Sequence, residues 1–218
     1  MASGATDRWA GATAALAERD PAMAAAVAAL GPCTLARRRH PGGAFGALAR
    51  SIVYQKLAGR AAAAIHARFL ALYGGRPTPQ AVMATADAEL RAAGLSANKA
   101  ASVKDLARNV LDGSLRLGRL RHLDDEAVVA RLSAVRGIGR WTAEMFLVFQ
   151  LNRPDVWPVG DLGVRSGFAL LKGMDAPPTP ARLRSLGEPY GPYRTVTAWY
   201  CWRLLDGRAG VSPGPEAW

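Results

Sequence analysis

The stretch VRGIGRWTAEMFLVFQLNRPDVWPVGDLGVRSG, residues 135–167, decides the fold. It opens on Gly137–Gly139, a short turn between two segments with apolar residues at helical spacing, and it closes on a Gly/Pro-rich loop that ends at Asp161. The glycines permit positive φ and leave the turn without side chains, so a large ligand can approach the backbone. The helix expected from Arg140 presents free N–H groups and a positive dipole end, which suit a phosphate, and Arg136 adds charge. The pattern predicts a helix, a tight turn and a second helix, and the turn either binds a phosphate or simply connects two packed helices.

The composition agrees with such a ligand. The chain has 218 residues, 50% of them hydrophobic, which is enough for a sizeable core in one compact unit or two small lobes. Lys and Arg number 28 against 17 acidic residues, giving a formal net charge of +11, which favours nucleic acid as the partner. A basic proteome would explain the charge equally well, so charge alone leaves both interpretations open.

The cysteine count limits the redox and metal chemistry. Cys33 and Cys201 are the only cysteines, and their separation argues against a disulfide framework and against a zinc or iron–sulfur cluster. The N-terminal segment carries charges that interrupt any signal-peptide pattern, and no apolar run is long enough to span a membrane. We therefore expect a cytoplasmic bacterial protein, associated with the nucleoid when it acts, with no membrane partner.

Apolar periodicity predicts an all-α protein. Gly and Pro separate the periodic segments, and the tail from Gly207 to Trp218 has no periodicity, so we expect it to be mobile or draped on the surface. The expected helices cover about 7–18, 21–30, 43–57, 60–73, 78–85, 98–112, 124–134, 140–151, 162–172, 179–187 and 192–206.

Segments in and around the opening stretch resemble a known family. Leu132–Ala143 is similar to the helix-hairpin-helix of a DNA glycosylase superfamily, and residues 155–167 resemble the Gly/Pro-rich loop of that superfamily, which ends in a catalytic aspartate. Further segments resemble the 3-methyladenine DNA glycosylase II family, namely Phe45–Phe69, Gly94–Ala107 and Tyr190–Leu205. The resemblance covers roughly residues 45–206.

The resemblance implies two helical lobes with an active-site cleft between them. We expect one lobe from residues 1–45 with 165–218 and a central lobe from residues 46–164, which carries the hairpin at about 132–145. Only about forty residues precede the first matching segment and they have a helical pattern, so we expect no extra N-terminal β domain. We also expect a monomer.

The implied activity is removal of a damaged base by cleavage of its N-glycosidic bond. A base inside a duplex is unreachable, so the enzyme must extrude the nucleotide, fill the gap and hold the base. Bond cleavage leaves the sugar oxocarbenium-like, and a carboxylate stabilises that charge and orients or deprotonates water. We assign this role to Asp161, which can also cap the helix that follows it. Strand-nicking relatives carry a lysine in the second hairpin helix; the matching residue here is Trp141, which predicts a monofunctional enzyme.

The remaining candidate residues fall into two groups. A cationic alkylated purine is attracted to an aromatic face, and an apolar side chain can replace the extruded base in the stack. Leu57 is the expected wedge, and the family often has glutamine where this chain has Lys56. The expected base-pocket residues are Trp141, Tyr193, Met145, Trp157 and Tyr54. The expected DNA-binding residues are Gln55, Lys56, Leu57, Lys99, Arg136, Gly137, Gly139, Arg140 and Thr142. Trp199 and Trp202, inside an apolar helix, are interpreted as core.

The expected partner is double-stranded DNA that contains alkylated bases. The substrate range is either 3-methyladenine alone or a wider set that includes 7-methylguanine and ethenoadenine. The chemistry needs no cofactor, although the superfamily's hairpin often holds Na⁺ or K⁺ through backbone carbonyls, here near Gly137 and Gly139. Two alternatives stay open. One is a noncatalytic helix-hairpin-helix module that binds DNA, and the other is a glycosylase for oxidised or mismatched bases.

Overall fold

The computed structural model describes residues 3–36, 39–57 and 59–209, and all regular secondary structure in these ranges is helical, as predicted. The elements are α1 (Ser3–Arg19), α2 (Pro21–Leu30), α3 (Gly43–Tyr54), α4 (Gly59–Ala71), α5 (Pro79–Ala84), α6 (Asp87–Ala92), α7 (Ala97–Leu111), α8 (Asp125–Ser133), α9 (Arg140–Phe149), α10 (Leu162–Leu171), α11 (Pro180–Leu186) and α12 (Arg194–Ala209), with the 3-10 helices η1 (Leu117–His122) and η2 (Glu188–Tyr190). None of these helices is long and apolar enough to cross a membrane.

The helix predictions need correction in several places, and at the N-terminus α1 starts at Ser3 and not at about residue 7. Helix α3 ends at Tyr54 and not at residue 57, because Gln55 adopts φ −53° and ψ 131° and leaves the helical region. Helix α6 was not expected, because Leu90 is its only large apolar residue and one such residue shows no periodicity. Glu89 stabilises its start by accepting the Ala86 N–H at 2.9 Å. Helix α12 continues to Ala209, and the rest of the predicted mobile tail lies outside the described residues.

The chain forms two compact units. In the described part, residues 3–36 and 152–209 make the terminal unit, and residues 39–151 make the central unit. The sequence placed the second boundary at 164/165, whereas the structure assigns the whole Gly/Pro-rich loop and Asp161 to the terminal unit. The reason is that this loop is hydrogen-bonded to α12. Each unit is described below by itself.

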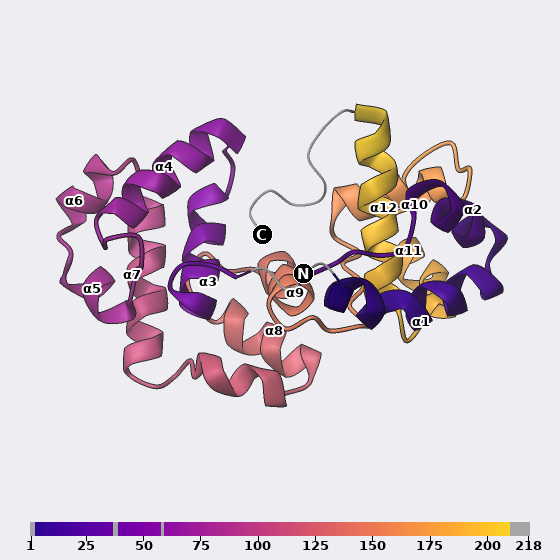
Figure 1. Cartoon of the computed structure of the whole chain (residues 1–218). Coiled ribbons are helices and arrows are strands. Elements are labelled where there is room, and N and C mark those ends of the chain that lie inside the picture. The colour runs from indigo at the N-terminus through magenta and orange to yellow at the C-terminus, as the bar shows by residue number, and fades with distance from the viewer. Residues whose placement is uncertain (1–2, 37–38, 58, 210–218) are drawn as a thin grey trace. The chain divides into compact units, whose positions relative to one another are not determined.

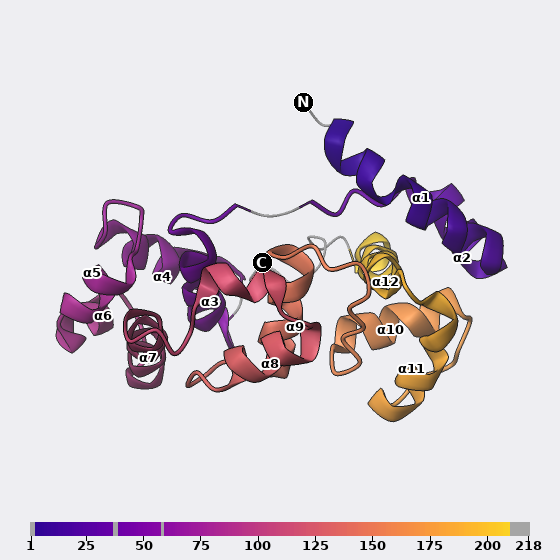
Figure 2. The same cartoon turned by 90° about the horizontal axis from the view of Figure 1, so that it is seen from below.

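The terminal unit joins the two ends of the chain. Figures 1 and 2 show α1 and α2, in indigo, grouped with α10 to α12, in orange and yellow. The Tyr200 hydroxyl donates to the Gly31 carbonyl at 2.8 Å. Asp20 Oδ2 accepts from the Tyr190 hydroxyl at 2.6 Å and from Lys172 Nζ at 2.9 Å. These long-range bonds hold the N-terminal helices against the C-terminal ones.

The central unit contains α3 to α9 and carries the hairpin between α8 and α9. Helix α9 is its innermost element, because every side chain from Thr142 to Phe149 is buried. Ser96 and Asp124 cap α7 and α8 by accepting the N–H groups of Lys99 and Ala127 at 3.3 and 2.7 Å. Helix α9 thus anchors the hairpin turn to the core of this unit.

Candidate active site

Asp161 lies at the end of the Gly/Pro-rich loop and is the N-cap of α10. Its Oδ1 accepts the Val164 N–H at 2.7 Å and the Trp202 indole N–H at 3.0 Å. Only 7% of the residue is exposed. Two donors therefore fix the orientation of a nearly dry carboxylate, so the capping role and a chemical role use the same side chain.

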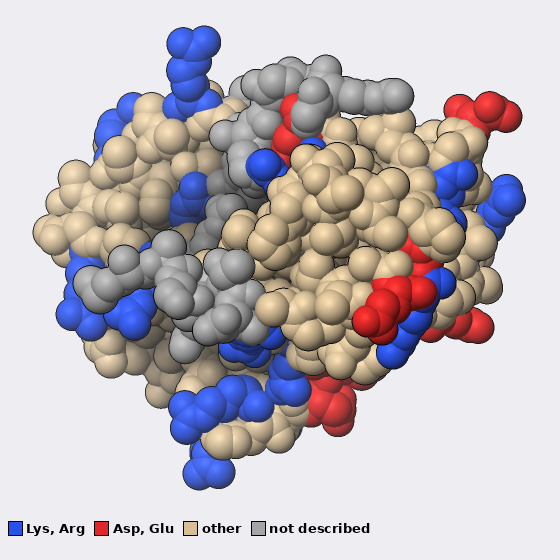
Figure 3. Space-filling model, turned by 45° about the vertical axis from the view of Figure 1, so that its right-hand side comes forward, with Lys and Arg blue, Asp and Glu red and all other residues tan. Residues whose placement is uncertain are grey.

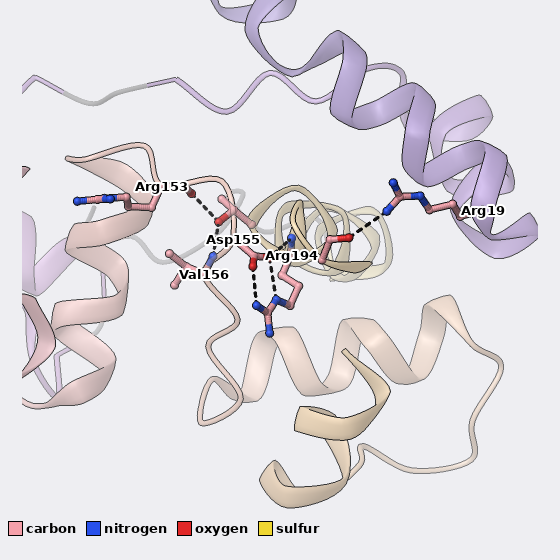
Figure 4. Close-up of polar contacts among 7 residues, drawn as sticks. Arg19, Arg153, Asp155, Val156 and Arg194 are labelled. Atoms are coloured by element: carbon pink, nitrogen blue, oxygen red, sulfur yellow. Dashed lines mark hydrogen bonds and ion pairs between the residues drawn. The ribbon is translucent and has the colours of Figure 1, made fainter. Parts of the chain in front are cut away.

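Helix α12 holds the beginning of the same loop (Figure 4). The Thr195 hydroxyl donates to the Arg153 carbonyl at 2.7 Å and accepts the Val156 N–H at 2.9 Å. Arg194 forms a bidentate pair with Asp155, with Nε–Oδ1 2.7 Å and Nη2–Oδ2 2.5 Å. This hydrogen-bonded pair raises the pKa of Arg194, so the guanidinium stays charged.

Thr195 and Trp202 are seven residues apart, so they lie on one face of α12. Thr195 holds the loop near Val156, and Trp202 holds Asp161 at the loop's other end. In Figure 4, Arg19 from α1 reaches a backbone carbonyl just before α12, that of Gly191, at 2.9 Å. One helix thus supports both ends of the segment that carries the carboxylate.

Two glycines of α10 allow this arrangement. A Cβ on Gly167 would lie 2.0 Å from the Cys201 carbonyl oxygen, so α10 and α12 pack closely at this point. A Cβ on Gly163, one turn earlier, would lie 3.0 Å from both Asp161 Oδ1 and Trp202 Cδ1. Gly163 therefore leaves the space in which the indole approaches the carboxylate.

The aromatic residues of the terminal unit differ from the predictions. Trp157 is packed in the core: its indole donates to the Leu183 carbonyl at 2.9 Å, and its ring lies against Phe168 and Tyr190. This packing argues against its predicted place in the base pocket. Trp202, interpreted as core, is buried but contacts Asp161. Trp202 follows Thr195 by seven residues, so both lie on one face of α12. This spacing would have indicated the contact with Asp161 only if the role of Thr195 in holding the loop had been known.

Tyr193 remains a base-pocket candidate. It is half-buried and lies between η2 and α12. Its backbone N–H donates to the Tyr190 carbonyl at 2.8 Å.

The hairpin turn in the central unit depends on one glycine. Gly137 has φ +79°, and a Cβ there would lie 2.5 Å from Ser102 Oγ. Gly139, in contrast, is the N-cap of α9 with an extended φ of −102°, and nothing lies within 4 Å of an added Cβ. No side chain caps α9 at Gly139, so the first N–H groups of this helix face an open turn, which suits an anion.

The hairpin is linked to the loop that carries the expected wedge. Gln55 Nε2 donates a hydrogen bond to the Gly137 carbonyl at 2.7 Å. This hydrogen bond uses one lone pair of an oxygen that was expected to bind a monovalent cation. The cation stays a prediction. Among the described residues, no three His, Cys, Asp or Glu side chains are gathered in a way that could hold a metal ion.

Residues 54–57 form a type II β-turn in place of the expected last helical turn. The Leu57 N–H donates to the Tyr54 carbonyl at 3.2 Å, and the two central residues, Gln55 and Lys56, have φ of −53° and +56°. Leu57 is 37% exposed, high for a large apolar side chain, as a wedge requires. The turn therefore presents Leu57 to solvent.

Three of the basic residues expected at DNA already have partners in the protein. Arg140 pairs with Glu126 (Nη1–Oε1 3.0 Å, Nη2–Oε2 2.6 Å), which raises the pKa of Arg140 and lowers that of Glu126. Arg136 donates through Nη2 to Asn98 Oδ1 at 3.3 Å. Lys99 Nζ donates to the Val53 carbonyl at 2.7 Å, and burial lowers its pKa. Lys99 thus caps the end of α3 in this structure, and its predicted phosphate contact is untested.

The other predicted residues of the central unit separate into exposed and buried groups. Trp141, in the first turn of α9, is half-exposed and stays a candidate for the base pocket. Met145 is fully buried and Thr142 is 3% exposed, so neither side chain is available to a base or a phosphate. Tyr54 is half-buried, with the Arg50 guanidinium 3.9 Å from its ring centroid and the His66 ring edge-on at 5.9 Å.

Comparison with known proteins shows the family of the chain. The family model described as HhH-GPD superfamily base excision DNA repair protein matches residues 49–192. The chain therefore belongs to the HhH-GPD superfamily of base excision DNA repair proteins.

Within that superfamily, the chain is similar to DNA-3-methyladenine glycosylase 1 of Schizosaccharomyces pombe, with 37% identity over 172 residues, 76% of this chain and 75% of the relative. Among solved structures, it is similar to the S. pombe 3-methyladenine DNA glycosylase Mag1 in complex with abasic DNA, with a TM-score of 0.82, 32% identity and coverage of 93% and 99% of the two chains. A DNA-3-methyladenine glycosidase from Bacillus halodurans gives a TM-score of 0.80 at 32% identity, over 89% of each chain.

Proposed function

We propose that this protein is a monofunctional DNA glycosylase that extrudes alkylated purines, 3-methyladenine first among them, and hydrolyses their N-glycosidic bond. The observation that carries the proposal is the Asp161 carboxylate, held at Oδ1 by the Val164 and Trp202 N–H groups. The names of the most similar relatives support the substrate class.

In the proposed reaction the departing base leaves a sugar with oxocarbenium character. The Asp161 carboxylate stabilises that charge more strongly in a nearly dry site than in water, and it orients or deprotonates the attacking water. An N3- or N7-alkylated purine is cationic, so it leaves readily without a strong general acid. Tyr193 offers an aromatic face for such a base.

The hydrolytic, non-lyase character rests on the residue in the second hairpin helix. Trp141 occupies the place where strand-nicking relatives carry a lysine, and no lysine occurs between Lys104 and Lys172. A Schiff base needs an amine at the reacting carbon, so the absence of lysine from this stretch disfavours lyase chemistry. We infer that water is the nucleophile and that the product is an abasic site in an intact strand.

The test is release of free 3-methyladenine and 7-methylguanine from methylated duplex DNA by the wild type and Asp161→Asn. Asparagine keeps an Oδ1 acceptor for Val164 and Trp202, so the variant should fold and bind DNA normally. We expect base release to fall at least about a hundredfold, the scale of one positioned catalytic group. Asp175→Asn, which removes an exposed carboxylate from the same unit, is the matched control and should retain full activity.

Other outcomes would select the alternatives. Intact DNA binding without release by either protein would favour a noncatalytic binding module. Preferential release of oxidised or mismatched bases would favour that class of glycosylase. A covalent protein–DNA adduct after borohydride reduction would refute the monofunctional assignment, because only a Schiff base is trapped in this way.

A further inference from the structure

A hollow of about 410 Å³ lies in the central unit, after the end of α7 and beside η1 and α8. Three arginines line it: Arg116 before η1, Arg119 within η1 and Arg131 in α8. Leu115 and Leu120, both about 2% exposed, form an apolar floor. The lining contains no acidic residue, so the hollow is a basic site with an apolar base.

The three arginines differ from their neighbours in lacking ion-pair partners. Elsewhere in this unit Arg108 pairs with Asp105 at 2.9 Å, and Lys104 pairs with Asp87. In the part of the chain that the structure describes, Arg116, Arg119 and Arg131 form no ion pair, and all three are exposed. Their guanidinium groups are thus available to an external anion.

The hollow lies close to the hairpin along α7. The hairpin contacts this helix at Asp105, whose Oδ2 accepts the Arg136 N–H at 2.9 Å. From Asp105 to the end of α7 at Leu111, a helix rises about 9 Å. A DNA strand that runs along α7 would cover this distance in about three nucleotides, since a strand rises about 3.4 Å per nucleotide. Figure 3 shows basic side chains gathered at the lower end of the view, the end at which Figure 1 places α8.

We propose that this hollow binds the phosphodiester backbone of the bound duplex, about two to four nucleotides from the phosphate at the hairpin. Guanidinium groups match phosphate oxygens in bidentate geometry, and the carbon face of a deoxyribose suits the leucine floor. The site lengthens the DNA footprint beyond the hairpin. The proposal uses the protein's DNA binding and does not depend on base release.

The test compares two triple variants that lose the same charge. Arg116→Gln/Arg119→Gln/Arg131→Gln removes the site, and Arg76→Gln/Arg91→Gln/Arg184→Gln removes three exposed arginines elsewhere. The dissociation constant for an undamaged fluorescent duplex is measured by anisotropy over a range of KCl concentrations. Each lost phosphate contact lowers the slope of log affinity against log salt by about 0.9.

We expect the slope to fall by about two to three for the site variant and by less than about one for the control. The site variant should bind at least about tenfold more weakly at 150 mM salt, and shortening the duplex on the hollow's side should abolish the difference. Both variants should keep the wild-type circular dichroism spectrum and melting temperature.

Equal behaviour of the two triple variants would overturn the proposal. So would unchanged DNA binding together with loss of poly-glutamate binding, which would assign the hollow to an acidic protein partner. Titration with inorganic phosphate tests whether the hollow binds free phosphate instead of DNA. Saturable phosphate binding at millimolar concentration, without any effect on DNA affinity, would identify such a site and overturn the proposal. Because undamaged DNA is used, failure of the glycosylase assignment would leave this result unaffected.

Discussion

Replacing Gly163 by alanine should reduce catalysis without unfolding the protein. The added Cβ would meet Asp161 Oδ1 and Trp202 Cδ1 at 3.0 Å and Trp202 Nε1 at 3.2 Å, so the indole or the carboxylate must move by a few tenths of an ångström. A hydrogen bond to a charged group contributes about 1.5–3 kcal/mol. If losing this hydrogen bond raises only the free energy of the transition state, the rate of base release falls roughly ten- to hundredfold.

Stability should change little, because two effects oppose each other. The close contact destabilises α10, whereas alanine favours a helix over glycine by about 1 kcal/mol. Gly160→Ala is the matched control: it lies on the other side of Asp161 in sequence, and nothing lies within 4 Å of its added Cβ. The assay is single-turnover release of 3-methyladenine beside thermal unfolding. Full activity in a folded Gly163→Ala protein would refute the idea that the indole orients Asp161.

Two further predictions concern the central unit. Lys56 has φ +56°, a conformation that favours glycine. By urea unfolding, Lys56→Gly should therefore be about 1 kcal/mol more stable than Lys56→Ala, which loses the same charge. Equal stabilities of the two variants would contradict the turn assignment. Burial, with the nearby charges of Arg50 and His40, lowers the pKa of His66 from 6.5 to about 4. The unfolded chain therefore takes up this proton first, and stability is lost as pH falls from about 6.5 toward 4. The full shift gives about 2 kcal/mol at pH 5, or about 1 kcal/mol after allowance for partial exposure. Urea unfolding should show that His66→Gln loses correspondingly less stability than the wild type between pH 7.5 and 5, and an equal loss in both proteins would contradict the assignment.

Local patterns predicted the hairpin and the place of Asp161. Gly137 needs positive φ, and Asp161 directly precedes an apolar helical segment, so both features are encoded within a few residues. The support of the loop by α12 could not be predicted in this way. It depends on hydrogen bonds between residues 39 and 41 positions apart, such as Val156 with Thr195 and Asp161 with Trp202.

The errors have similar physical causes. Trp157 was a base-pocket candidate because it is close to Asp161 in sequence, but its indole finds a partner at Leu183 in the core. Helix α3 was extended to residue 57 because Lys56 gives no sign in sequence of a left-handed conformation. Met145 follows Trp141 by one helical turn, so both were placed on the same face of the helix. Spacing alone does not show that the turn with Met145 is buried whereas the turn with Trp141 is partly exposed.

The discontinuous terminal unit has a consequence for synthesis of the chain. Helices α1 and α2 bury Trp9, Leu16 and Met23, yet the partner helix α12 leaves the ribosome about 160 residues after α2. At about 5–20 residues per second this delay is roughly 8 to 30 s, and the continuous central segment can fold during it. During this delay the apolar faces of α1 and α2 lack their partner helix. This is the period in which a chaperone would act on this protein, and low temperature or rare codons before α12 would prolong it.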